Sequence, residues 1–149
     1  EYLGPLPIIV QGCVGIQTDN KNFKNYVLIK FWWSPEVSES SQGELTLEAG
    51  HQLLETIIRC WSPHLATWTT TTWLRAVPKR EAYTPSLGWK TYFSEPAACE
   101  LISDLGKPLH QGILLETSSD IHDVTPEKIV ALAQELSNRG IESVLYRGT

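Results

Sequence analysis

The most constraining feature of this sequence is a strand, a loop and a helix between residues 112 and 140. The apolar run at 112–115 predicts a buried strand, and the polar residues 116–124 predict a loop. Thr125 can then accept a hydrogen bond from a free N–H of a first helical turn, and Pro126 suits the first helical position. A helix that starts here needs a surface to pack against.

The apolar residues of that helix form one stripe. Ile129, Leu132, Ala133 and Leu136 repeat at positions i, i+3, i+4 and i+7, and Gly140 follows as a helix stop. Because one stripe of a helix must be covered, we expect this helix to lie on a sheet or on another helix.

The first third of the chain predicts a hairpin and a second helix. Residues 5–18 and 26–33 are β-prone runs separated by a polar segment, which favours two antiparallel strands. The second run is apolar on both faces except at Lys30, so we expect a central strand. Thr46 can cap a helix over about 47–61, whose apolar residues repeat with helical spacing.

The remaining segments predict more strands and one further helix. Four consecutive threonines favour a strand at 69–77, and 87–93 is a second strand candidate. Residues 94–96 predict the start of a helix leading to Leu105. Residues 141–146 fit a short edge strand or a trailing end. We therefore predict one α+β domain over 1–149, with an antiparallel sheet of about four to six strands and two or three packed helices.

Composition narrows the class of partner and the compartment. A net charge of −5 argues against direct binding to nucleic acid, which needs a concentrated surplus of Lys and Arg. The three cysteines have no paired spacing, which favours a reducing compartment, and no apolar run approaches a membrane span. The chain lacks methionine, so Glu1 is not a translation start; a trimmed chain and a processed precursor both remain open.

Common catalytic and nucleotide-binding fingerprints are absent from the sequence, and we predict no metal and no cofactor. His51 and Glu55 lie four residues apart on the predicted helix at 47–61, a spacing that a metal site or an acid/base pair could use. No second histidine or carboxylate at a matching spacing completes such a site, so the simpler interpretation is a solvated pair.

Two further features are candidates for recognition. Asp120, His122 and Asp123 crowd into the loop before the helix at 125, where negative charge is favourable without any other role. A charged exposed loop suits partner binding better than catalysis, since no nucleophile is paired with that histidine. Trp32 and Trp33 are adjacent on a strand and point to opposite faces, so one of them is a candidate interface anchor, while burial of both is equally open.

Several segments, in their order and spacing, resemble the immunity protein 52 family. They are Trp33-Ser34-Pro35-Glu36, the helix at 53–60, Pro63 to Trp68, Gly88 to Ser94, and the strand at 112–115 with the helix start Thr125-Pro126-Glu127-Lys128. The resemblance spans roughly residues 26–145. Glu36 stands where the family usually has Arg, and Thr125 and Lys128 replace Asn and His.

The resemblance implies an immunity (antitoxin) protein that binds and neutralises a cognate bacterial toxin. Such toxins are delivered between competing cells, type VI secretion included, and are often nucleases with a restriction-endonuclease-like domain. The implied protein is cytoplasmic and not an enzyme. The partner-binding residues that we expect come from the acidic loops and the adjacent tryptophans of this sequence, not from the family: they are Trp32, Glu36, Glu39, Glu44, Asp120, His122 and Asp123.

Two alternatives stay open. One is a small hydrolase-type enzyme that uses His122 with Asp120 or Asp123. The other is a periplasmic immunity protein against a cell-wall-targeting toxin, whose signal peptide was cut before Glu1.

Overall fold

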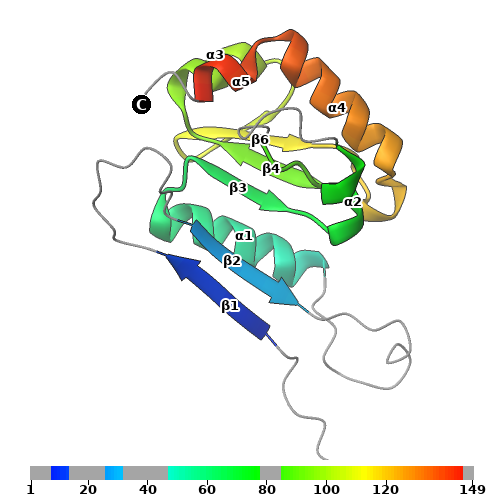
Figure 1. Cartoon of the computed structure of the whole chain (residues 1–149). Helices are drawn as coiled ribbons and strands as arrows, with labels where there is room; N and C mark the ends of the chain where they lie inside the picture. The colour runs from blue at the N-terminus through cyan, green and yellow to red at the C-terminus, as the bar shows by residue number, and fades with distance from the viewer. Residues whose placement is uncertain (1–7, 14–25, 32–46, 78–84, 146–149) are drawn as a thin grey trace, which may run out of the picture. The chain divides into compact units, whose positions relative to one another are not determined.

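The computed structural model describes residues 8–13, 26–31, 47–77 and 85–145 (Figure 1). The chain divides into two units, residues 1–47 and residues 48–149. In chain order the described elements are β1 (Ile8–Cys13), β2 (Tyr26–Phe31), α1 (Leu47–Trp61), β3 (Leu65–Trp68), α2 (Thr71–Ala76), β4 (Lys90–Phe93), α3 (Pro96–Ile102), β5 (Lys107–Leu109), β6 (Gly112–Glu116), the 3-10 helix η2 (Ile121–Asp123), α4 (Pro126–Asn138) and α5 (Ile141–Leu145). The fold is α+β with antiparallel strands, as the sequence predicts.

The first unit contains the predicted hairpin strands. β1 and β2 are antiparallel, with Ile8 opposite Phe31 and Cys13 opposite Tyr26. Within the described ranges β2 pairs with β1 alone, so the prediction of a central strand is wrong there. Apolar residues on both faces of a strand do not by themselves specify a second hydrogen-bonded neighbour.

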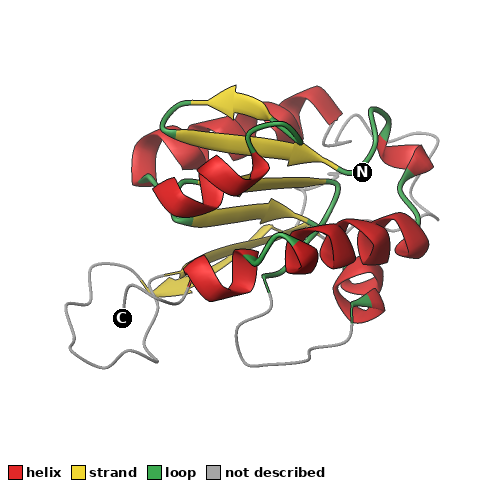
Figure 2. Cartoon of the chain, turned by 90° about the horizontal axis from the view of Figure 1, so that it is seen from above, coloured by secondary structure: helices red, strands yellow, loops and turns green. Residues whose placement is uncertain are grey.

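The second unit is built on a four-stranded sheet in the order β3-β4-β6-β5. Every neighbouring pair is antiparallel, with Thr91 opposite both Thr67 and Leu115. Figure 2 shows these strands side by side, with helices flanking the sheet. Antiparallel pairing through four strands confirms the predicted type and size of sheet.

The two faces of this sheet carry separate hydrophobic clusters. Tyr92 and Leu114 lie opposite each other and pack with α1. Phe93 and Ile113, one residue further along each strand, point the other way and pack with α3, α4 and α5. Successive strand residues alternate between faces, so one short sheet can bind α1 on one side and the three later helices on the other (Figure 1).

Trp68 joins the two clusters, because its indole packs against both of them. The ring lies edge-on to Trp89, with 5.1 Å between ring centroids. It also lies against Gly50 of α1, where an added Cβ would be 1.8 Å from Trp68 Cη2. The missing side chain at Gly50 is therefore what lets α1 approach the ring.

The helix predicted from Thr125 is confirmed. Thr125 Oγ1 accepts a hydrogen bond from the main-chain N–H of Lys128, and Pro126 is the first residue of α4. Ile129 and Leu136, on the predicted stripe, are buried. Gly140 adopts a φ of 79°, which turns the chain directly into α5.

Three predicted elements differ from the structure. The strand at 69–77 is wrong, because β3 ends at Trp68 and Thr70 caps α2 by accepting from the Trp73 N–H at 3.2 Å. The edge strand at 141–146 is also wrong, because α5 forms and buries Ile141. α3 ends at Ile102, earlier than predicted, and the short helices α2 and α5 bring the helices above the expected two or three.

The sheet ends at β5, which the sequence did not suggest. β5 is three residues long and pairs with β6 through a tight turn in which His110 has a φ of 50°. Its middle residue is Pro108, and Lys107 is exposed. Thus β5 has one N–H fewer than a typical strand.

Candidate functional site

The loop at residues 117–124 follows β6 and is tied to the segment before β4. The Thr117 N–H donates to the Trp89 carbonyl at 2.9 Å, and Thr117 Oγ1 donates to the Gly88 carbonyl at 2.7 Å. Trp89 Nε1 in turn donates to the Ser118 carbonyl at 2.9 Å. Since Trp89 is buried, these bonds fix the start of the loop to the core of the unit.

The end of the same loop is fixed by local hydrogen bonds. Asp120 caps η2, its Oδ1 accepting from the His122 N–H at 2.8 Å, and the Val124 N–H donates to the Ile121 carbonyl at 3.1 Å. Val124 is buried in the core. With both ends held, Asp120, His122 and Asp123 all have exposed side chains on one short segment.

The structure brings these three predicted residues together without assembling a catalytic pair. Asp120 binds the main chain of His122, and no hydrogen bond among the described residues joins the His122 imidazole to Asp120 or Asp123. The described residues also contain no group of three or more His, Cys, Asp or Glu side chains able to hold a metal ion. The side chains of Asp120, His122 and Asp123 thus form a small exposed polar surface.

His51 and Glu55 form the predicted pair, with 3.1 Å between Nε2 and Oε1. They are not a purely solvated pair, because His51 Nδ1 also lies 3.2 Å from Lys90 Nζ on the sheet. Lys90 Nζ donates to Glu116 Oε1 at 2.8 Å, and Lys107 Nζ donates to the other carboxylate oxygen at 3.0 Å. We call these five residues the charge cluster.

Lys90 is the least exposed member of the charge cluster, with a side chain only 8% exposed. Its Nζ lies 4.7 Å from the centroid of the Trp89 ring, a cation–π contact. Burial alone would raise the pKa of Glu116, but hydrogen bonds from Lys90 and Lys107, together with their charges, lower that pKa below its usual value. Glu116 is therefore held ionised between two lysines.

Sequence reasoning missed Lys90, Glu116 and Lys107 as members of a site. Each is a single charged residue at the end of a short strand, which has no distinctive spacing. The register supplies the missing information, because it places Lys90 directly opposite Glu116. A charged residue within an otherwise apolar strand is the one sequence signal that could have been used.

The other predicted contact residues, Trp32, Glu36, Glu39 and Glu44, lie outside the described residues. Among the later tryptophans, Trp61 at the end of α1 is 50% exposed, whereas Trp89 is buried. Trp61 is thus a large exposed apolar side chain that the sequence prediction did not single out.

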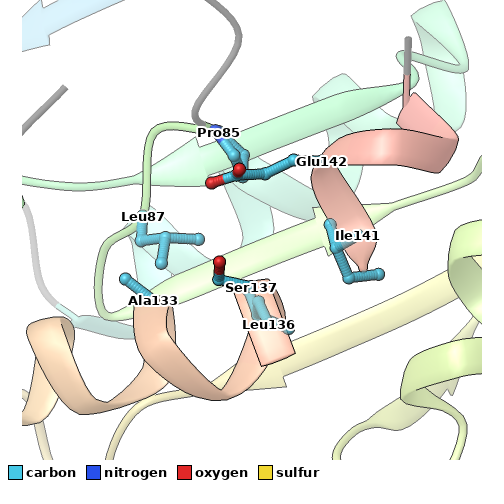
Figure 3. Close-up of a pocket in the computed structure, with 7 residues that line it drawn as sticks. All are labelled: Pro85, Leu87, Ala133, Leu136, Ser137, Ile141 and Glu142. Carbon is cyan, nitrogen blue, oxygen red and sulfur yellow. The ribbon is translucent and has the colours of Figure 1, made fainter. Parts of the chain in front are cut away.

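One small cavity lies where α4, α5 and the segment before β4 meet (Figure 3). Its volume of about 10 Å³ is enough for at most one water molecule. The lining is mostly apolar, and its residues are Pro85, Leu87, Ala133, Leu136, Ser137, Ile141 and Glu142. A cavity of this size is a packing defect and has no room for a substrate or cofactor.

Comparisons of the chain with protein-family models, with curated proteins and with solved structures return no match. The resemblance to the immunity protein 52 family therefore stays a prediction. No helix among the described residues is long and apolar enough to cross a membrane.

Proposed function

We propose that this chain is an immunity protein that binds and neutralises a bacterial toxin, and that the toxin is a nuclease with a restriction-endonuclease-like domain. The segments that resemble the immunity protein 52 family include residues 53–60 of α1, the segment Gly88 to Ser94 that contains β4, and the strand and helix start that flank the 117–124 loop. In this proposal the protein is cytoplasmic and acts on toxins delivered between competing cells.

The observation that carries the proposal is the geometry of the 117–124 loop. Its main chain is fixed at Thr117, Ser118 and Val124, while Asp120, His122 and Asp123 remain exposed. A segment already held in one conformation loses little entropy when a partner binds it. A rigid, polar and exposed loop is thus suited to recognising a protein surface.

The sign of the charge supports a basic partner. The chain has a net charge of −5, and two of the three exposed loop residues are aspartates. A nuclease must have a basic cleft to bind the phosphates of DNA, and an acidic inhibitor is attracted to such a surface. The loop would either cover that cleft or bind beside it.

The direct test uses the toxin encoded beside this gene. We expect the purified chain to bind that toxin, to inhibit its nuclease activity in a stoichiometric ratio, and to protect cells that express it. Failure to bind or to inhibit would refute the proposal.

The role of the loop is tested with Asp123→Asn and a matched control. Asp123→Asn removes one exposed charge from the loop, and we expect slower association and a weaker dependence of affinity on salt. Glu100→Gln removes one exposed charge from α3, and we expect no change in either quantity. Equal effects of the two substitutions would show that net charge, not the loop, determines binding.

A further inference from the structure

The charge cluster restricts the protonation state of His51. An ammonium group has donors and no lone pair, so in its 3.2 Å contact with Lys90 Nζ the Nδ1 atom of His51 must accept. The remaining proton of a neutral imidazole is then on Nε2, which faces Glu55 Oε1 at 3.1 Å. The geometry therefore selects one neutral tautomer of His51.

Among the described residues, the charged groups that His51 meets directly or through Lys90 are balanced. Glu55 comes from α1, Lys90 from β4, Glu116 from β6 and Lys107 from β5, while β3 contributes no charged residue. Two carboxylates and two ammonium groups cancel when His51 is neutral. A second proton on His51 would add an uncompensated positive charge beside Lys90, the most buried member of the charge cluster.

The two contacts of His51 respond differently to that proton. The contact with Glu55 survives, because Nε2 still donates, but it is screened by solvent, since Glu55 is 34% exposed. The contact with Lys90 cannot survive, because both partners are then donors and both are positive. Lys90 keeps Glu116 as a partner, so His51 is the side chain that must move.

We propose that the contact between His51 and Lys90 is a proton-sensitive latch that holds the first turns of α1 on the sheet. Histidine is the side chain that commonly changes charge between pH 5 and 8. The latch is closed while the His51 imidazole is neutral and opens when His51 takes up a second proton, which loosens the start of α1 while β4 and β6 remain paired.

The proposal is tested by amide hydrogen exchange at about pH 7.5 and about pH 5.5, with rates corrected for intrinsic exchange. We expect the protection of the amides at residues 51–55 to fall roughly tenfold at the lower pH, as for loss of one hydrogen bond to a charged group. The amides of Leu114 and Leu115 in β6 serve as the internal reference and should keep their protection. Equal protection of residues 51–55 at both pH values would overturn the proposal.

Two variants separate the latch from other effects of acid. In His51→Asn the amide oxygen takes the place of Nδ1 and accepts from Lys90 at both pH values, so the tenfold ratio should disappear. His64→Asn, at an exposed histidine before β3, should keep the ratio of the wild type. A ratio that persists in His51→Asn, or disappears in His64→Asn, contradicts the assignment to His51.

A second measurement does not depend on any variant. The ¹⁵N spectrum of the His51 ring at about pH 7.5 should show a proton on Nε2 and none on Nδ1. A proton on Nδ1 under these conditions would be incompatible with the contact to Lys90 and would also refute the latch.

Discussion

Substitution of Gly50 by alanine sets two physical effects against each other. Glycine inside a helix is less favourable than alanine by about 1 kcal/mol, so helix propensity alone predicts that Gly50→Ala stabilises α1. The structure predicts the opposite, because the new Cβ would lie 1.8 Å from Trp68 Cη2 and 2.4 Å from Cζ3. The sign of the change in unfolding free energy decides between them.

The magnitude follows from how far the ring must move. Carbon atoms in contact are about 3.5–4.0 Å apart, so Trp68 would have to shift by roughly 2 Å. The ring packs against both hydrophobic clusters and against Trp89, so it cannot shift without disturbing them. Overpacking of this kind costs about 1–3 kcal/mol. Taking the upper end and subtracting the propensity gain leaves a net loss of about 2 kcal/mol.

The assay is urea unfolding followed by far-ultraviolet circular dichroism, which does not depend on tryptophan fluorescence. In thermal unfolding of a chain of this size, the same loss of about 2 kcal/mol would lower Tm by about 4–8 °C. The double variant Gly50→Ala/Trp68→Leu completes a cycle. With the indole removed, Gly50→Ala should stabilise by about 1 kcal/mol.

Two results would refute this reasoning. One is a Gly50→Ala variant more stable than the wild type, which would mean that α1 does not approach Trp68 as closely as the structure shows. The other is the same effect of Gly50→Ala with and without Trp68→Leu, which would place its cause elsewhere.

Three further predictions concern a cap, an ion pair and the loop. Thr70→Ala removes the cap of α2, and urea denaturation should show an unfolding free energy lower by about 1 kcal/mol. Thr72→Ala changes an exposed residue of the same helix and should leave the unfolding free energy unchanged or slightly raised. Because the pKa of Glu116 is lowered in the folded state, its ionised form adds stability above the ordinary glutamate pKa of about 4.3, and that stability is lost as the pH falls through the lowered value. The difference in unfolding free energy between wild type and Glu116→Gln should therefore narrow from about pH 6 to about pH 3, and a constant difference would contradict the assignment. His122→Ala should keep the circular dichroism spectrum and lose only part of the affinity for the toxin, about tenfold or less, whereas complete loss of function with the fold intact would favour the enzyme alternative.

The elements that could be predicted from sequence are those whose local signals agree. α1 has helical spacing of its apolar residues, and its bounds at Leu47 and Trp61 match the prediction. α4 has a cap, a proline at its first position and an apolar stripe, all of which the structure retains. In these two helices the local signals and the tertiary packing favour the same structure, so the local sequence is enough to predict them.

The elements that were missed are those where packing overrides local preference. The threonines at 69–72 favour a strand by propensity, but Thr69 Oγ1 donates to the Leu87 carbonyl and Thr70 Oγ1 caps α2. α5 is only five residues long, and its formation depends on burying Ile141 in the core. The Thr70 cap is a local signal, but the Thr69 bond and the burial of Ile141 cannot be read from the local sequence, because both depend on segments far away in the chain.

The candidate site divides in the same way. The exposed loop residues follow from a polar segment before a capped helix, and the structure places Asp120, His122 and Asp123 there together. The charge cluster does not follow, because His51, Lys90 and Glu116 come from three separate elements. The strand register and the approach of α1 to the sheet bring these three residues together, and neither can be read from the sequence pattern.

The short strand β5 has a consequence for how this protein behaves at high concentration. An outer strand with free N–H and C=O groups can recruit a strand from another molecule, which is the first step of many aggregates. β5 offers three residues, of which Pro108 has no N–H, and Lys107 brings a charge that is 78% exposed to the same border. These features disfavour edge-to-edge growth of the sheet through β5, which lowers the tendency of the protein to polymerise along this border.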